Sequence, residues 1–519
     1  MMFAVFLGAI DLTVVATIMP RMISDLGINT ADIDRYIWIV NSYLIGYIVS
    51  IPLFGRLADV IGVRNALVIS TVIFAAGSWW CAIGERLQDL IFGRAVQGFG
   101  AGALLPLALA TAAALFEDSA RAQAVGVIGA TDEIGWVSGP AYGAIVVNTV
   151  EFIDDPWRLV FWVNIPIAAI LVGLAWWKLE GVEIEPAPHP GSLVQRLDLP
   201  GFALLSIFLV AINLALASGG EIGATAGRGL RAFGGTPNPM ADHIPLLLGI
   251  AATTLLLLVL WFRREEDPLI PKRLLRFRSF RSSLGANFLI GTVLMTGMVN
   301  VPVLVALLET GADTASRSAL LLAPFTASIA ACSILSARLM QHLGSGRVTL
   351  MGLVITLVGN LAIYPLLELA DYEWISLGLA ISGAGIGLAL TPLGTTALQA
   401  TTRRDRGAAA SALLVVRLLG MTIGMSVLTS IGVQRLQILT GRLEPMVRGA
   451  DETTAEFLLR QQQYIIEEGL PLGVQVVQET FLVAGLLTAV ALFPAWQLAR
   501  GDDHVPPASS DTRPRQSAS

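Results

Sequence analysis

Long apolar runs recur along this chain of 519 residues, and they constrain its fold more than any other feature. A run of about 18–25 apolar residues is long enough to cross the roughly 30 Å hydrocarbon core of a bilayer as a helix. Hydrophobic residues make up 55% of the chain and charged residues only 14%. This composition is typical of a polytopic membrane protein. We therefore expect an all-α fold that spans a membrane many times.

The apolar runs predict about fourteen spanning helices, grouped as six, two and six. They lie near residues 2–24, 36–55, 66–84, 90–115, 124–148, 159–179, 199–218, 246–262, 284–308, 319–340, 348–367, 374–398, 408–433 and 474–499. This map predicts a first six-helix bundle (1–180), a linker with two additional helices (181–282) and a second six-helix bundle (283–500). A polar tail (501–519) is expected to be disordered.

Charges in the loops predict the orientation. The loop from Arg263 to Arg281 is rich in arginine, whereas the segments around Asp25, Asp154 and Asp371 are acidic. Basic loops stay on the cytoplasmic side. We therefore expect a multi-pass protein of the inner (plasma) membrane with both termini in the cytoplasm. Segment 434–473 then lies outside, where a helical extension of the spans and a docking or substrate-guiding surface are both open readings.

Several classes of function are excluded by what the sequence lacks. The net charge of −6 gives no surface for nucleic acid, and Cys81 and Cys332 lie in apolar runs, so neither a disulfide framework nor a metal site is expected. No lysine completes a phosphate-binding glycine loop. We expect no cofactor, and a proton gradient rather than ATP as the source of energy.

The segment GRLADVIGVRN, Gly55 to Asn65, follows the second predicted span. Its pattern G-x-L-x-D-x-x-G-x-R resembles the cytoplasmic signature of the major facilitator superfamily. The resemblance implies two six-helix bundles that rock against each other. It also implies a cytoplasmic gate motif formed by Gly55, Asp59, Gly62 and Arg64, with Asp59 and Arg64 in one charge network. A degenerate copy, Ser336 to Arg347, keeps Gly344 and Arg347 and indicates an internal repeat.

The segment GVIGATDEIGWVSGPAYGA, Gly126 to Ala144, resembles the antiporter signature of this superfamily, with Ala144 in place of the last glycine. Small residues four apart form a flat face for close helix packing, and proline adds a bend. The resemblance implies export rather than uptake. The residues that carry the motif are Gly126, Gly135, Gly139, Pro140 and Gly143.

Five charged residues fall inside predicted spans, where charge is costly and marks function. They are Asp11, Arg94, Asp132, Glu133 and Arg417. No span contains a histidine, so the carboxylates are the expected proton carriers, because burial disfavours their charged form. Glu133 is the preferred carrier and is expected to face the central cavity, with Asp132 nearer the packing face. Candidate pairs are Asp11 with Arg94, and Arg417 with Asp132 or Glu133.

The first span, LGAIDLTVVATIMP, resembles that of fourteen-helix drug:proton antiporters, and Arg94 lies in a segment similar to their proton-transfer motif. The segments WRLVFWVNIPI, LDLPGFALL and PLIPKRLLRFRSF extend the likeness along the chain. Within this subfamily the chain is similar to the mycobacterial branch that exports drugs and triacylglycerol. That likeness implies a lipid substrate and a periplasmic lipoprotein as partner. We also expect the transporter to be a monomer.

The leading hypothesis is a proton-coupled exporter of large apolar or amphipathic molecules, and the alternative is a multidrug:proton pump without a lipid role. Two other classes are weaker. A membrane-embedded enzyme would need Asp132 and Glu133 as an acid/base pair, but adjacent residues on a helix point apart. A scaffold or receptor for a periplasmic partner would not need the coupling motifs.

Overall fold

The computed structural model describes residues 1–25, 33–116, 118–149, 155–178, 197–223, 243–265, 268–308, 314–368, 372–399, 401, 405–442 and 453–500. Within these ranges the chain is helical and contains no strand, which confirms the expected all-α class. Most of the linker 180–198, the glycine-rich loop 219–245 and the whole tail 501–519 lie outside the described residues.

The helices follow the predicted spans closely. Their bounds are α1 Met2–Asp25, α2 Ile33–Ile61, α3 Val63–Ile83, α4 Leu87–Ala101, α5 Leu104–Leu115, α6 Asp118–Thr149, α7 Arg158–Lys178, α9 Leu199–Gly223, α11 Ile244–Arg264, α12 Arg278–Leu308, α13 Thr314–Leu343, α14 Ser345–Glu368, α15 Tyr372–Gln399, α16 Arg406–Thr440, α17 Thr454–Tyr464 and α18 Leu470–Arg500. Short 3₁₀ (Leu274–Arg276) and π (Ile465–Gly469) segments precede α12 and α18.

Twelve helices of the described part are long and apolar enough to cross a membrane, with α4 and α5 counted as one span. α1 and α6 are not among these twelve. α6 is 32 residues long and carries the acidic pair Asp132 and Glu133, which lowers its hydropathy. The multi-pass membrane class is established, and the count of fourteen stays a prediction.

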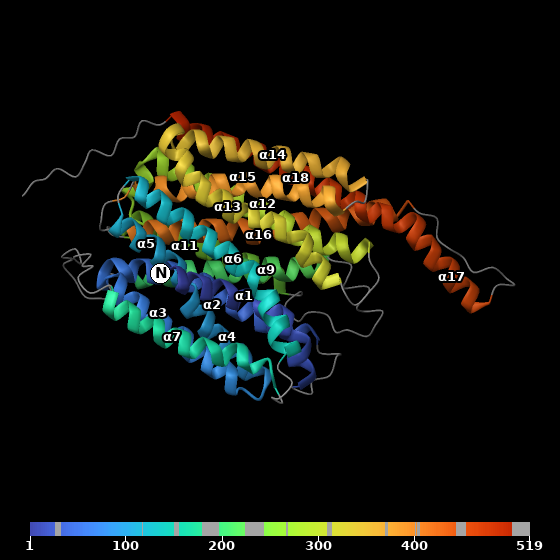
Figure 1. Ribbon diagram of the computed structural model, residues 1–519, viewed down its shortest axis with the longest axis horizontal. Helices are drawn as coiled ribbons and strands as arrows, with labels where there is room; N and C mark the ends of the chain where they lie inside the picture. Colours follow the sequence, from blue (N-terminus) through green and yellow to red (C-terminus); the bar gives the residue numbers. More distant parts are fainter. Residues whose placement is uncertain are drawn as a thin grey trace, which may run out of the picture.

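The helices pack as two groups with a pair between them (Figure 1). α1 packs along α6, and α4 packs against α2 and α3. In the second group α15 packs against α13 and α14, while α12 lies between α16 and α18. The pair α9 and α11 pack on each other, and α9 contacts α16 and α2. The residue boundaries predicted for these groups stay a prediction.

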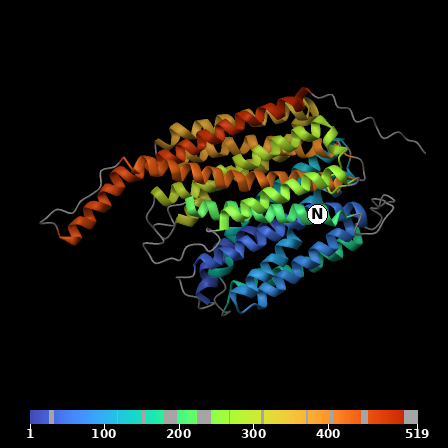
Figure 2. The same ribbon diagram turned by 180° about the vertical axis from the view of Figure 1, so that it is seen from behind.

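The two groups meet through α6 with α13 and α15, and through α16 with α2 and α5. Away from these contacts the groups diverge toward the end from which α17 projects, as the front and rear views both show (Figures 1 and 2). The contact residues lie near the predicted cytoplasmic end. This is the arrangement expected for a state that is closed at that end.

Matching glycines show the internal repeat in the backbone. Gly62, between α2 and α3, has φ 87°, and Gly344, between α13 and α14, has φ 79°. A left-handed residue between two helices favours glycine, which has no Cβ to clash. The two halves thus turn at equivalent positions, as the degenerate motif predicted.

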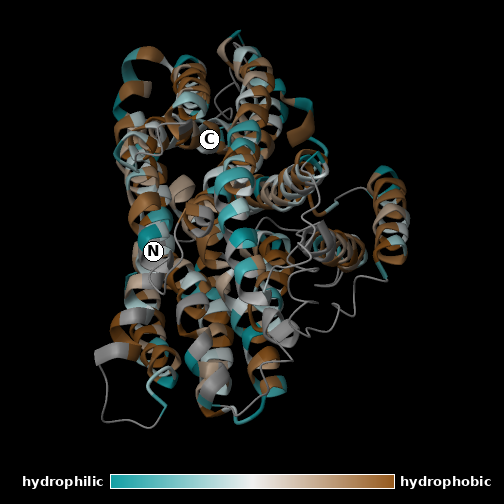
Figure 3. Cartoon of the chain, turned by 90° about the vertical axis from the view of Figure 1, so that its right-hand side faces the viewer, coloured by the Kyte–Doolittle hydropathy of each residue, from teal (hydrophilic) through white to brown (hydrophobic). Residues whose placement is uncertain are grey.

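The helix surfaces suit a lipid environment. Apolar residues predominate along the bundle (Figure 3), and Ile170, Trp177 and Leu486 are at least 62% exposed on its outside. The described parts of segment 434–473 continue the spans as helices, with α16 running to Thr440 and α17 leading into α18. This agrees with the helical-extension reading, while residues 443–452 lie outside the described part.

Candidate functional site: two buried charge clusters

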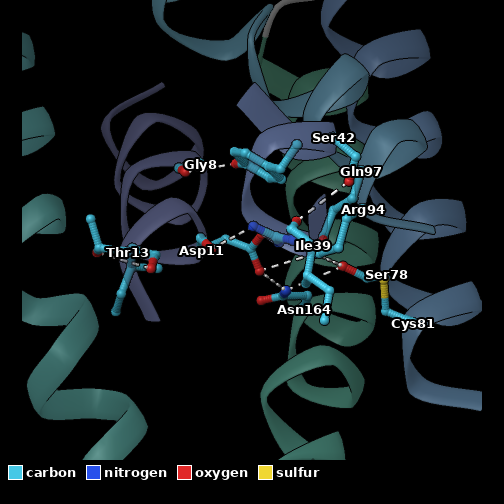
Figure 4. A network of polar contacts seen from close by, with 12 residues as sticks. Gly8, Asp11, Thr13, Ile39, Ser42, Ser78, Cys81, Arg94, Gln97 and Asn164 are labelled. Atoms are coloured by element: carbon cyan, nitrogen blue, oxygen red, sulfur yellow. Dashed lines mark hydrogen bonds and ion pairs between the residues drawn. The ribbon is translucent and has the colours of Figure 1, made fainter. Parts of the chain in front are cut away.

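The first cluster lies inside the first helix group and joins α1 to α4 (Figure 4). Arg94 donates from Nη1 to Asp11 Oδ2 at 2.6 Å, so the candidate pair Asp11–Arg94 forms. Both side chains are at most 1% exposed. The guanidinium also lies 3.9 Å from the ring centre of Tyr43, whose hydroxyl donates to the Gly8 carbonyl. Burial, the ion pair and the contact with Tyr43 fix the position of the Arg94 guanidinium.

Amide side chains complete the coordination of Asp11. Its Oδ1 accepts from Gln97 at 3.0 Å and from Asn164 at 2.7 Å, and both amides also donate to Ser78 Oγ. A buried carboxylate with one ion pair and two amide donors is well compensated. Gln97 lies three residues after Arg94, in the segment that resembles the proton-transfer motif, whereas sequence reasoning missed Asn164 and Ser78. A lone amide in the apolar run WRLVFWVNIPI was the available signal.

The second cluster lies between the two helix groups. Arg417 of α16 donates from Nη2 to Asp132 Oδ2 of α6 at 3.3 Å, and Asp132 is 4% exposed. Glu133 is 5% exposed, and among the described residues it has no hydrogen bond or ion pair of its own. Its electrostatic neighbours are Asp132 and Arg417. The chain thus places one carboxylate in an inter-group ion pair, and beside it a second carboxylate that has no hydrogen bond or ion pair among the described residues.

A cavity of about 60 Å³ adjoins this pair. It is lined by Asp132 and Arg417 and by apolar residues of both groups, among them Leu105, Leu109, Val125, Leu390, Leu413 and Leu414. Asp132, which was expected nearer the packing face, lies instead toward the second group, so that expectation is wrong. Glu133 is not in the lining of this cavity, and its expected place at the central cavity stays a prediction. Asp132 shares its face of α6 with Gly129 and Val125, three and seven residues earlier, and this face lies toward the second group.

The antiporter motif changes partner along α6. Gly135, Gly139 and Gly143 pack against α1, where a Cβ at each would meet atoms of Ala9, Thr13 and Val14. Gly126 instead lies against Ser333 of α13. Nine residues at about 100° each place Gly126 on the opposite side of the helix from Gly135. The motif therefore serves two contacts, one within the first group and one between groups; Pro140 lies within α6.

Replacing Gly139 with valine tests this packing. A Cβ there would lie 2.8 Å from the Ile10 carbonyl oxygen and 2.9 Å from the Val14 nitrogen, so α1 and α6 must separate. Overpacking of this kind typically costs about 1–3 kcal/mol. We expect a lower melting temperature for Gly139→Val in detergent. Gly129→Val is the matched control, because a Cβ at Gly129 meets nothing within 4 Å; equal melting of both variants would contradict this account.

The gate motif contacts the second group through backbone rather than through Arg64. Asp59 accepts from the N–H groups of Gly407 and Ala408 at 2.9 Å each, at the start of α16. Gly55 allows this approach, since a Cβ there would collide with Ser411 and the Gly407 carbonyl. Arg64 instead lies 4.2 Å from the ring centre of Trp176. The predicted Asp59–Arg64 network is therefore wrong, because a helix N-terminus supplies the partner for the carboxylate.

The Asp59 contact should favour the state closed at this end. We expect Asp59→Ala to increase opening roughly two- to thirtyfold, since loss of an N-cap costs about 0.5–2 kcal/mol. The measurement is the maleimide labelling rate of Ser411→Cys, a position 3% exposed, with Cys81 and Cys332 replaced by alanine. Arg64→Gln serves as the control within the same motif. An unchanged labelling rate in the Asp59 variant would show that the contact of Asp59 with the start of α16 does not stabilise the closed state.

Sequence reasoning missed a further pair beside this gate. Arg273, in the segment before α12, donates through Nε and Nη2 to both carboxylate oxygens of Asp405, just before α16. Asp405 is fully buried. Its position in a run of charges, RRDR, looked like an exposed loop. Among the described residues, no group of three or more His, Cys, Asp or Glu side chains is placed to hold a metal.

Known proteins resemble this chain over most of its length. Residues 1–425 match the family model described as Major Facilitator Superfamily. A probable triacylglyceride transporter of Mycobacterium leprae is 33% identical over 463 residues, which cover 84% of each chain. A triacylglyceride transporter of Mycobacterium tuberculosis strain H37Rv is 34% identical over 461 residues, covering 84% of this chain and 83% of the relative.

Solved structures share the fold at low identity. The human organic anion transporter MFSD10 (TETRAN) has a TM-score of 0.59 at 14% identity, covering 95% of this chain and 97% of that chain. The proton:xylose symporter XylE has a TM-score of 0.57 at 14% identity, covering 96% of this chain and 94% of that chain. These likenesses concern the arrangement of helices alone.

Proposed function

Because the chain belongs to the Major Facilitator Superfamily and is a membrane transporter rather than an enzyme, we propose that it is a proton-coupled exporter. Its substrate class is large apolar or amphipathic molecules, with membrane lipid such as triacylglycerol first. Transport proceeds by alternating access, in which the two helix groups open first at one end and then at the other. We place it in the plasma membrane, with both termini cytoplasmic, as a monomer.

The observation that carries this proposal is the acidic pair at the contact between groups. Asp132 is ion-paired to Arg417 across the contact, and Glu133 is buried next to it without a partner among the described residues. A proton on Glu133 removes one buried negative charge beside the Asp132–Arg417 ion pair. That pair crosses the contact between the helix groups, so in this proposal only the state in which the contact is closed keeps it. A ligand shifts an equilibrium by its differential affinity for the two states. Glu133 is thus the proton carrier in this proposal, and Asp132–Arg417 is the latch that responds.

The other intramembrane pair has a different proposed part. Asp11 and Arg94 lie within one helix group, and their charges are satisfied there by Gln97 and Asn164. Their contacts need not change when the groups rock. We assign them to bracing α1 against α4. The double variant Asp11→Leu/Arg94→Met tests whether they also take part in proton transfer.

The substrate assignment rests on the site and on the relatives. The cavity between the groups has six leucine and valine residues in its lining, beside the polar or charged Asp132, Asn287, Ser333, Thr391 and Arg417, so it offers apolar contact next to one ion pair. The similar mycobacterial proteins are named triacylglyceride transporters. A periplasmic lipoprotein that receives the lipid is the partner that the mycobacterial resemblance suggests.

A multidrug:proton pump is the second candidate, because leucine and valine side chains beside the buried Asp132 also suit a lipophilic cation. The test is transport in proteoliposomes with an imposed pH gradient. Labelled triacylglycerol and an ethidium-like cation are supplied in parallel. Gradient-dependent movement of the lipid supports the first candidate, movement of the cation alone supports the second, and no gradient dependence for either overturns proton coupling.

A further inference from the structure

A second and larger cavity, of about 370 Å³, lies away from the contact between groups. It is formed by α9, α11 and the segment 268–275, and it shares no lining residue with the cavity beside Asp132. Leu205, Leu258, Val259, Phe262, Ile270 and Leu275 make its wall apolar. Its volume falls within the range of about 300–1,000 Å³ that ligand pockets occupy. Nothing in the transport proposal uses it.

The cavity is built by an unusual residue. Asp198 is the non-glycine residue with a positive φ, 47°, in the described chain. Its carboxylate accepts from Gly201 N at 3.1 Å, from Leu269 N at 2.8 Å and from Trp261 Nε1 at 2.9 Å. A strained backbone persists only where surrounding contacts fix it. Asp198 therefore ties the start of α9, the end of α11 and the following segment into one fixed wall.

These contacts explain two motifs left without a role. In LDLPGFALL, Asp198 makes these contacts. Gly201 leaves room for its carboxylate, since a Cβ at Gly201 would collide with it. In PLIPKRLLRFRSF the first residues supply the wall. Three N–H groups stabilise the Asp198 carboxylate, which keeps its negative charge in the wall of the cavity.

Among the described residues, the mouth of the cavity carries three basic side chains, with Glu265 as the acid beside them. Arg263, which lines it, and Arg264 are exposed at the end of α11. Lys272 donates to the Arg263 carbonyl at 3.1 Å and keeps further N–H donors. Trp261 and Phe262 precede these charges, as aromatic residues do at a membrane surface. Apolar walls below a cluster of cations match the shape and charge of a lipid with an anionic headgroup.

We propose that this cavity binds an anionic phospholipid of the adjoining leaflet. One acyl chain lies along Leu258 and Leu275, and the phosphate lies against Arg263, Arg264 and Lys272. Basic pockets between membrane helices on the cytoplasmic side bind anionic headgroups in this way. The lipid is a resident ligand on the outer side of α9 and α11, not the transported molecule.

The site also adjoins the gate. Segment 268–276 carries both cavity residues and Arg273, which holds the buried Asp405 next to α16. Gly407, whose N–H donates to Asp59 at the gate, lies two residues after Asp405. A bound lipid therefore orders the segment that supports the closed gate.

Native mass spectrometry of the full chain in detergent tests the proposal, with phosphatidylglycerol and phosphatidylcholine added separately. We expect one phosphatidylglycerol to be retained, in preference to phosphatidylcholine. The double variant Arg263→Gln/Arg264→Gln should weaken that retention by about tenfold or more, the effect of two basic residues at a membrane surface. Arg500→Gln, an exposed arginine on α18, is the matched control and should bind as the wild type does.

A second variant tests the apolar part. Leu258→Trp fills the cavity without touching the charges and should abolish retention, and an unchanged melting temperature without lipid shows that it folds. Equal retention of both lipids by the wild type, or retention of phosphatidylglycerol by the double arginine variant and by Leu258→Trp, would overturn the proposal. None of these variants alters the Glu133 cluster, so failure here is separate from failure of proton coupling.

Discussion

Replacing Glu133 with glutamine is expected to uncouple export from the proton gradient while leaving the protein folded. Glutamine has nearly the same shape but cannot bind and release a proton in the working range. A gradient of one pH unit stores about 1.4 kcal/mol per proton, equal to a tenfold concentration ratio. Wild-type proteoliposomes should export against a substrate gradient up to about that ratio for each proton exchanged. The Glu133→Gln variant should only equalise the two sides.

The measurement is initial rate and final distribution of the labelled substrate at several imposed gradients. Glu373→Gln is the matched control, because Glu373 is an exposed glutamate in the first turn of α15. It should behave as the wild type does. If Glu133→Gln still exported against a gradient, the proton would be carried elsewhere, and Asp132→Asn would be the next variant to test.

Helix positions were predictable from the sequence because hydrocarbon imposes one rule on every span: about twenty apolar residues with all backbone groups paired internally. The motif glycines were predictable as packing positions for a related reason, since only small residues let two backbones approach. Their partners were not. Whether a glycine of α6 lies against α1 or α13 depends on the rotation and crossing of helices, as Gly126 and Gly135 show.

The charged residues show the same limit. Their cost in the membrane revealed Asp11, Arg94, Asp132, Glu133 and Arg417 as important. Which acid faces which base depends on tertiary packing, so Asp132 was placed near the packing face although it meets Arg417 across the contact between groups. Asp59 was assigned a side-chain partner because the sequence does not show that the start of α16 lies beside it. Neutral partners such as Asn164 carry a still weaker signal, because an amide in an apolar run is common.

Replacing Arg94 with alanine is expected to destabilise the protein more than any other single change described here. The variant leaves Asp11, 1% exposed, without its cation. Removing one partner of a buried ion pair typically costs about 3–5 kcal/mol. Gln97 and Asn164 still donate to the carboxylate, so we expect the lower part of that range. The measurement is thermal unfolding in detergent, followed by the yield of monodisperse protein.

The surface pair Arg21–Asp25 is the matched control, since it joins the same residue types within α1. Arg21 is half exposed and Asp25 is 13% exposed, and an ion pair whose cation water already solvates contributes little. Arg21→Ala should therefore melt as the wild type does. Equal destabilisation by both variants would show that α1 itself, rather than the buried pair, is fragile.

A double variant, Asp11→Leu/Arg94→Met, separates bracing from proton transfer. Replacing a buried ion pair with apolar residues of similar volume is often neutral or stabilising, and Gln97 and Asn164 keep Ser78 as an acceptor. We expect this variant to regain most of the stability that Arg94→Ala loses. If it also exports in proportion to the proton gradient, Asp11 and Arg94 act as a brace. If it folds but loses that dependence, Asp11 carries a proton together with Glu133, because a purely structural pair would not affect the coupling of a stable transporter.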